Sequence, residues 1–189
     1  MTTVDLYVRA MRSTLRIIDG VPRDRWHAPT PCSEWDAMQV ANHIIGENLW
    51  AAELFQGKTV DQVGDKLDGD LTEDDPAAAY RRSVAVAQAV VEAPGAAEAT
   101  CHLSFGDYSG ADYASQLFMD TLIHGWDIAK GTGRDTDLDL DAELVSACLP
   151  IAQELTRQFR GAGVFGEDLS AEADRDPQTK LLALVGRRP

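Results

Sequence analysis

Several long segments with apolar side chains at helical spacing, each bounded by glycine or proline, constrain the fold of this chain most strongly. In the first segment, residues 4–18, the apolar side chains are three or four positions apart: Val4, Val8, Met11, Leu15 and Ile18. That spacing places them on one face of an α-helix, and Gly20 and Pro22 end the helix. Further helices are predicted over residues 35–56, 76–92, 111–131 and 139–160, with a short one over 177–185.

Three details of these helices can be read from single residues. Ser33 is the predicted N-cap of the second helix, with Asp36 as a shorter version of the capping-box acid. Pro76 opens the third helix, where its missing N–H costs nothing. Pro150 lies inside the fifth helix, so we expect a kink or a break into two pieces there.

The connections between the helices carry little strand signal. Residues 58–75 are polar and acidic and predict a loop, while residues 100–108 predict an irregular or weakly extended link. Long helices with short or moderate links predict an all-α fold, a four-helix up-down-type bundle with one longer crossover. One extra C-terminal helix and a short tail helix complete it, and we expect a single domain over residues 1–189.

Charge and composition exclude some partners. The chain has 17 Lys and Arg against 31 Asp and Glu, a formal net charge of −14, whereas nucleic acids and anionic membranes require a basic surface. No apolar run approaches the ~18 residues of a transmembrane helix, and the N-terminus lacks the features of a secretory signal. Cys32, Cys101 and Cys148 are odd in number and widely spaced, so we expect a reducing cytoplasm and small apolar thiols rather than ligands.

Two of the four histidines lie in predicted helices, each one turn from a carboxylate. His43 precedes Glu47 by four positions, and Asp120 precedes His124 by four, with Asp127 three positions later. Residues four apart are separated by about 40° around a helix, so each pair shares one face. Two such helices packed side by side would bring two imidazoles and two or three carboxylates to one point.

This donor set is typical of a transition-metal site. Imidazole suits zinc, nickel, copper and iron, and three protein ligands with one open position describe a catalytic site. The alternative is that both histidines are surface or satisfied core residues. A metal is favoured at His43, because a carboxylate beside it on an apolar helix face needs a partner. At His124 both interpretations stay open, because the most apolar face of its helix is turned away from it.

Two stretches of the chain are similar to a known family. Residues 26–36 read Trp-His-Ala-Pro-Thr-Pro-Cys-Ser-Glu-Trp-Asp, and residues 41–48 continue with Ala-Asn-His-Ile-Ile-Gly-Glu-Asn. Residues 117–127 read Leu-Phe-Met-Asp-Thr-Leu-Ile-His-Gly-Trp-Asp. Together they resemble the N-terminal metal-binding domain of mycothiol-dependent maleylpyruvate isomerase, in the DinB/YfiT-like superfamily. The tail, over 163–166 and 176–187, is similar to a compact actinobacterial branch of these proteins.

The resemblance implies a four-helix bundle that binds one divalent metal, usually zinc or nickel. The metal ligands of the family correspond to His43, Asp120 and His124. The isomerase has Glu where this chain has Asp120, which is shorter by one methylene, so the metal would lie closer to that helix or be bound more weakly. The implied cosubstrate is a small-molecule thiol, mycothiol, which would attack an electrophilic substrate. Glu47 and Asp127 would act as bases or as partners of the imidazoles.

Three functions stay open from the sequence. The first is a metal-dependent thiol transferase or isomerase-like enzyme, in which the metal makes the thiol a thiolate. The second is a non-catalytic metal-binding module for regulation or dimerisation, with a homodimer as its form. The third is a thiol-independent metal hydrolase that uses the same ligands. An open coordination position that faces a pocket would favour an enzyme, and a closed site would favour the module.

Overall fold

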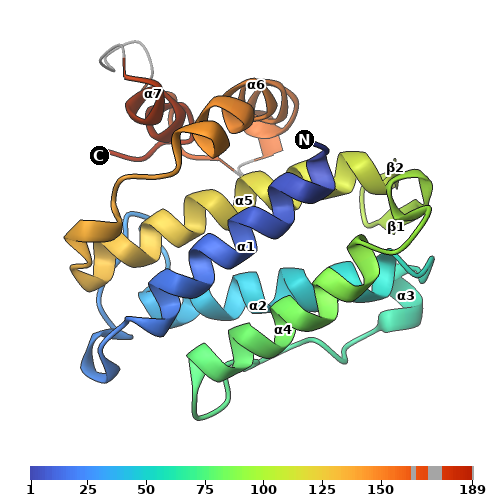
Figure 1. Cartoon of the computed structure of the whole chain (residues 1–189), viewed down its shortest axis with the longest axis horizontal. Coiled ribbons are helices and arrows are strands. Elements are labelled where there is room, and N and C mark those ends of the chain that lie inside the picture. Colours follow the sequence, from blue (N-terminus) through green and yellow to red (C-terminus); the bar gives the residue numbers. More distant parts are fainter. Residues whose placement is uncertain (163–164, 170–175, 189) are drawn as a thin grey trace.

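The computed structural model describes residues 1–162, 165–169 and 176–188. Within them, four long helices form a bundle: α1 (Thr3–Asp19), α2 (Ala37–Leu54), α4 (Pro76–Val91) and α5 (Gly110–Thr132). Figure 1 shows the bundle with the C-terminal helices α6 (Ala142–Phe159) and α7 (Pro177–Leu184) on one side. The predicted all-α bundle is confirmed. Part of the tail used for the resemblance, residues 163–164, lies outside the described residues.

The order of the helices around the bundle brings α2 and α5 side by side. Helix α1 packs mainly on α5 and α4, and α2 packs on the same two helices, so α1 and α2 lie across a diagonal. The long connection over 55–75, which contains the short helix α3 (Val60–Val63), returns the chain along the bundle. Helices α2 and α4 therefore run in the same direction (Figure 1).

A buried polar network links three helices through the centre of the bundle. The Tyr7 hydroxyl of α1 donates to Asn48 Oδ1 of α2 at 2.6 Å, and Asn48 Nδ2 donates to Ser83 Oγ of α4 at 2.9 Å. All three side chains are buried among apolar neighbours. Leaving one of these groups unpaired would cost about 1–3 kcal/mol, so the network sets the relative positions of these helices.

Helix α2 begins later than the sequence indicated. Its N-cap is Asp36, whose side chain accepts the Gln39 N–H at 2.8 Å, while the Gln39 side chain accepts the Asp36 N–H. The prediction of Ser33 as N-cap is wrong, because the chain turns just before the helix. The Thr30 hydroxyl donates to the Trp35 carbonyl at 2.8 Å within this turn. The turn places Trp35 immediately ahead of α2.

Two of the remaining elements are more regular than the sequence indicated. Helix α6 runs continuously through Pro150, so of the kink or break expected there the break is wrong; buried side chains on both sides, such as Val145 and Ala152, hold it against the body. The stretch expected to be irregular or weakly extended is extended, and it forms an antiparallel hairpin of β1 (Thr100–Leu103) and β2 (Gly106–Ser109). Short 3₁₀ turns are η1 (Arg23–Arg25), η2 (Ala96–Glu98), η3 (Asp135–Asp137) and η4 (Arg160–Ala162). Across the described part of the chain, every helix is too short or too polar to cross a membrane.

Candidate metal centre

Helices α2 and α5 bring the two predicted histidine–carboxylate pairs to one point. Nε2 of His43 lies 3.1 Å from Asp120 Oδ2, and Nε2 of His124 lies 3.4 Å from Asp120 Oδ1. The two imidazole rings meet edge to face, with centroids 5.0 Å apart. One carboxylate of α5 therefore bridges an imidazole from each helix.

The geometry of these three groups fits a divalent transition metal. One potential ligand atom from each residue lies within 4.8 Å of those of the other two. A tetrahedral zinc site with bonds of ~2.1 Å has ligand atoms about 3.4 Å apart, which is close to both imidazole–carboxylate separations. Two imidazole nitrogens and one carboxylate oxygen are also the donor set that zinc and nickel accept. Metal ligation by His43, Asp120 and His124 stays a prediction.

Electrostatics at the cluster favour a compensating positive charge. Burial lowers the pKa of His124, but the carboxylates of Asp120 and Asp127 outweigh it and raise that pKa to about 9. Burial opposes ionisation of Asp120, yet the two imidazoles hold its pKa well below the usual range. A divalent cation would take the place of the imidazole protons, so metal binding should release protons.

The orientation of His124 is set by a second carboxylate. Its Nδ1 lies 3.0 Å from Asp127 Oδ2, and the Asp127 side chain is fully buried. Arg187, which follows α7, donates to both Asp127 oxygens, from Nη2 at 2.8 Å and from Nε at 3.1 Å. A carboxylate on Nδ1–H leaves Nε2 as the free nitrogen that faces Asp120, the arrangement seen behind metal-ligating histidines. Asp127 is therefore placed to orient His124 and is not among the residues that line the cavity described below; its role as a base or as a partner of the imidazole stays a prediction.

Glu47 lies one turn beyond His43 on α2 and interacts electrostatically with Asp120 and both imidazoles. Burial, together with repulsion from Asp120, raises the pKa of Glu47 to about 7. A carboxyl group with such a pKa is suited to accept and return a proton at neutral pH. Its role as a base stays a prediction.

Three residues beside the cluster were not identified from the sequence. The Trp35 ring lies against both imidazoles, with centroids 4.8 Å from that of His43 and 5.7 Å from that of His124. Cys32 has its sulfur within 4.8 Å of ligand atoms of His124 and Asp127, so it is not the isolated apolar thiol we expected. The third residue is Arg187. In the sequence, its position directly after Gly186, just beyond the last helix, was the only feature that marked it.

The other two histidines and the other two cysteines lie away from the cluster. His27 pairs with Asp36 at 3.0 Å and His102 with Asp107 at 2.7 Å, so each has a local carboxylate partner. The remaining cysteines, Cys101 and Cys148, are buried free thiols, as expected.

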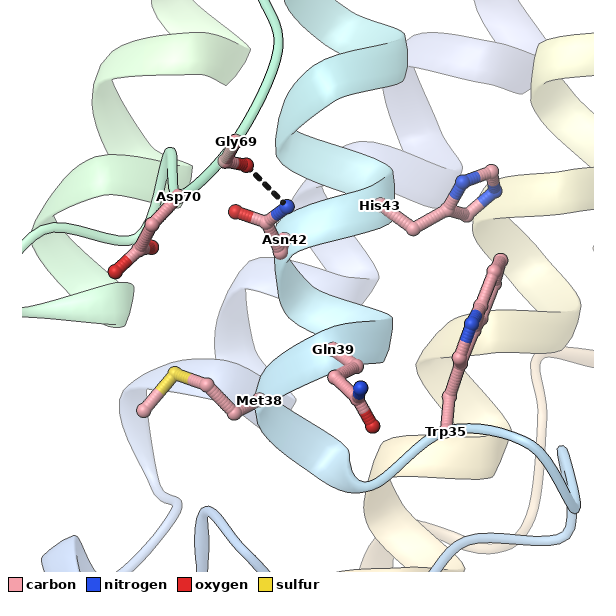
Figure 2. Close-up of a pocket in the computed structure, with 7 residues that line it drawn as sticks. All are labelled: Trp35, Met38, Gln39, Asn42, His43, Gly69 and Asp70. Atoms are coloured by element: carbon pink, nitrogen blue, oxygen red, sulfur yellow. Dashed lines mark hydrogen bonds between the residues drawn. The ribbon is translucent and has the colours of Figure 1, made fainter.

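A cavity of about 510 Å³ opens beside His43, on the outer side of α2 (Figure 2). It lies between α2, the turn before it and the loop over 69–70, and it is lined by Trp35, Met38, Gln39, Asn42, His43, Gly69 and Asp70. Asn42 ties the loop to α2, since its Nδ2 donates to the Gly69 carbonyl at 3.0 Å and its Oδ1 accepts the Leu71 N–H. The cluster is therefore next to a space that a small molecule can enter.

Known proteins share sequence with this chain over much of its length. The sequence model of the mycothiol maleylpyruvate isomerase N-terminal domain matches residues 7–129. Two Mycobacterium tuberculosis proteins, from strains CDC 1551 / Oshkosh and ATCC 25618 / H37Rv, are each 33% identical over 185 residues, covering 95% of this chain and 94% of theirs. Both are described as uncharacterized. No solved structure gives a significant match.

Proposed function

The chain belongs to the family of the mycothiol maleylpyruvate isomerase N-terminal domain, and from this we propose that it is a divalent-metal-dependent transferase of a low-molecular-weight thiol. Mycothiol, which the family description names, is the proposed thiol, and an electrophilic small molecule is its acceptor. The observation that carries the proposal is the bridging of His43 and His124 by Asp120 beside an open cavity. A closed cluster would instead have favoured a structural site.

Three residues would hold the metal: His43, Asp120 and His124. A bound zinc or nickel ion would favour the thiolate form of the thiol, which is the nucleophilic form. The Asp127 carboxylate keeps the proton of His124 on Nδ1, so that Nε2 stays directed at the cluster. The side chain of Trp35 covers both imidazoles on one side and limits the access of water.

In this proposal Glu47 accepts the thiol proton at its carboxylate. A raised pKa near 7 makes it a stronger base than an ordinary glutamate while leaving it partly ionised at neutral pH. The same carboxylate could accept a proton from a water molecule, so a thiol-independent metal hydrolase is the second candidate function. A non-catalytic metal-binding module is the third.

The test begins with elemental analysis of the purified protein and calorimetric titration of zinc and nickel into the chelator-treated protein. We expect one equivalent of metal, lost in His124→Ala and retained in His27→Ala, which removes a surface histidine paired with Asp36. Transfer is then measured with mycothiol and 1-chloro-2,4-dinitrobenzene, with and without the thiol.

The outcomes separate the three functions. Metal binding with thiol-dependent turnover supports the transferase. Metal binding with ester hydrolysis that needs no thiol would replace it by the hydrolase. Metal binding without turnover across a broad panel of electrophiles would leave the module, and absence of metal binding would remove all three.

A further inference from the structure

Tyr113 is a buried tyrosine near the start of α5 that has no role in the site described above. Its ring stacks on that of Phe55, just beyond α2, with centroids 5.6 Å apart. Only 4% of the residue is exposed, yet its hydroxyl makes no hydrogen bond with any other residue that the structure describes. Hydroxyls in such positions are nearly always hydrogen-bonded, so this one requires an explanation.

The hydroxyl of Tyr113 lies where a small molecule can touch it. Within the described part of the chain, every fully enclosed side-chain nitrogen or oxygen has a hydrogen-bond partner. Tyr113 has none, so the exposed 4% of this residue includes its hydroxyl oxygen. The same holds for Glu47, whose carboxylate makes no hydrogen bond or ion pair with the described residues. Both groups are therefore open to a ligand.

Tyr113 and Glu47 lie in one row with the predicted metal ligands, along the contact between α2 and α5. His43 in α2 faces Asp120, and Phe55 beyond the end of α2 faces Tyr113 near the start of α5, so the two helices run antiparallel. At 1.5 Å per residue, Glu47 is about 6 Å along the bundle from His43, and Tyr113 is about 10 Å from Asp120 in the same direction. Glu47 therefore lies between the cluster and Tyr113.

At neutral pH Tyr113 can offer this space a hydrogen-bond donor. Burial, and then the charge of Glu47, raise the pKa of Tyr113 well above its ordinary value, so the hydroxyl keeps its proton. In a thiol transfer, negative charge moves from sulfur onto the acceptor molecule and reaches any carbonyl or nitro oxygen conjugated with the attacked carbon. A fixed donor directed at such an oxygen stabilises the transition state.

We propose that the Tyr113 hydroxyl donates a hydrogen bond to an oxygen of the small-molecule acceptor, bound next to Glu47. This adds a catalytic residue to the proposed function and rests on it for the thiol. Sulfur forms a bond to the electrophilic carbon, and the displaced π electron pair moves to the conjugated oxygen, which accepts the hydrogen bond while Tyr113 keeps its proton. Glu47 takes the thiol proton and releases it to water. With 1-chloro-2,4-dinitrobenzene, the electron pair returns to the ring and expels chloride.

The kinetic test uses Tyr113→Phe, which removes the hydroxyl and keeps the ring on Phe55. For the zinc-loaded protein with mycothiol and 1-chloro-2,4-dinitrobenzene, kcat should fall about 10²-fold, the usual cost of losing one donor to a developing oxyanion. Tyr80→Phe is the matched control, because it removes a buried hydroxyl that donates to the Met11 carbonyl at 3.5 Å. The control should keep the wild-type rate, and zinc uptake and melting temperature show that both variants are folded.

A binding test needs neither metal nor turnover. The four tyrosines of the chain are labelled with ¹³C at Cζ, whose NMR shift responds to hydrogen bonding of the hydroxyl, and the Tyr113 signal is identified by its loss in Tyr113→Phe. The probes are 1,3-dinitrobenzene, which has oxygen acceptors and no leaving group, and toluene, which has no oxygen. We expect 1,3-dinitrobenzene to shift the Tyr113 signal of the metal-free protein and toluene to leave it in place.

The results separate this inference from the proposed function. Absence of zinc uptake or of thiol-dependent turnover contradicts the proposed function, and the binding test then decides the inference alone. An unchanged kcat in Tyr113→Phe, or an equal fall in Tyr80→Phe, would overturn the inference. So would a Tyr113 signal that does not move with 1,3-dinitrobenzene, or that moves equally with toluene.

Discussion

The Arg187 guanidinium donates two hydrogen bonds to the carboxylate of Asp127, which lies 60 residues earlier in the chain. Asp127 in turn holds Nδ1 of His124, so the C-terminal tail is linked to the predicted metal ligand through one buried carboxylate. The family match ends at residue 129, and Arg187 lies outside it. This chain therefore supports its histidine with a residue from beyond the matched region.

Replacing Arg187 by methionine should weaken metal binding. Loss of a direct partner of a metal-ligating histidine typically reduces metal affinity about 10–100-fold; Arg187 reaches His124 only through Asp127, so we expect the lower end of that range. The dissociation constant is measured by competition with a chromophoric chelator. Arg188→Met is the control, since Arg188 is the exposed neighbour of Arg187. A lower melting temperature with unchanged metal affinity would show that Arg187 only anchors the tail.

Replacing Asp120 by asparagine should abolish tight metal binding, because both imidazoles lose the shared anion that faces them. Asp120→Glu should retain the metal, since it preserves charge and matches the glutamate expected in the related isomerase. Asp112→Asn, at an exposed carboxylate of the same helix, serves as control. Retention of stoichiometric zinc in Asp120→Asn, by elemental analysis after dialysis, would exclude Asp120 as a ligand.

Glu47→Gln should leave the metal bound and slow thiol transfer by about 10²–10⁴-fold, the usual contribution of a general base. The wild-type rate should rise with pH along a limb that ends below pH 7, since the carboxyl group must lose its proton to act as a base. Its pKa is about 7 in the metal-free site, and a bound cation lowers it. In Glu47→Gln this increase of the rate with pH should disappear. Equal loss of metal would instead make Glu47 a fourth ligand and favour a structural site.

Gly125→Ala should destabilise the protein by about 1–3 kcal/mol, the typical cost of overpacking a core. A Cβ atom there would lie 2.4 Å from Thr14 Oγ1, so α1 and α5 would have to separate. Gly161→Ala is the control, because an added Cβ atom at that position meets nothing within 4 Å. Urea unfolding followed by circular dichroism measures both. Equal stability of the two variants would contradict the close packing of α1 on α5.

The three thiols should react with iodoacetamide in a set order. Burial raises the pKa of Cys101 to about 11 and that of Cys148 to about 12, so neither forms thiolate at pH 8. Cys32 is only half-buried and should be labelled first. Peptide mass spectrometry after timed alkylation gives the order. Labelling of Cys148 before Cys32 would contradict the burial of these side chains.

The sequence by itself determined the elements whose signals are local. The spacing of His43 with Glu47 and of Asp120 with His124 depends only on the period of an α-helix, and so do the long helices that carry them. The all-α bundle followed from the same period and from the glycines and prolines between the helices. The exact start of α2 could not be predicted from local preference. Ser33 and Asp36 are both good N-caps, and only the folded turn before α2 selected Asp36.

The helix pattern did not show that these groups meet; apart from the family resemblance, only the tertiary structure decided it. The placing of α2 against α5 set the distance between His43 and Asp120, and a helix pattern does not say which helices become neighbours. Trp35, Asp70 and Arg187 reach the site from turns and loops, whose paths depend on long-range packing rather than on a repeat. Their contacts join residues far apart in the chain, and such contacts are set by the shape of the assembled core.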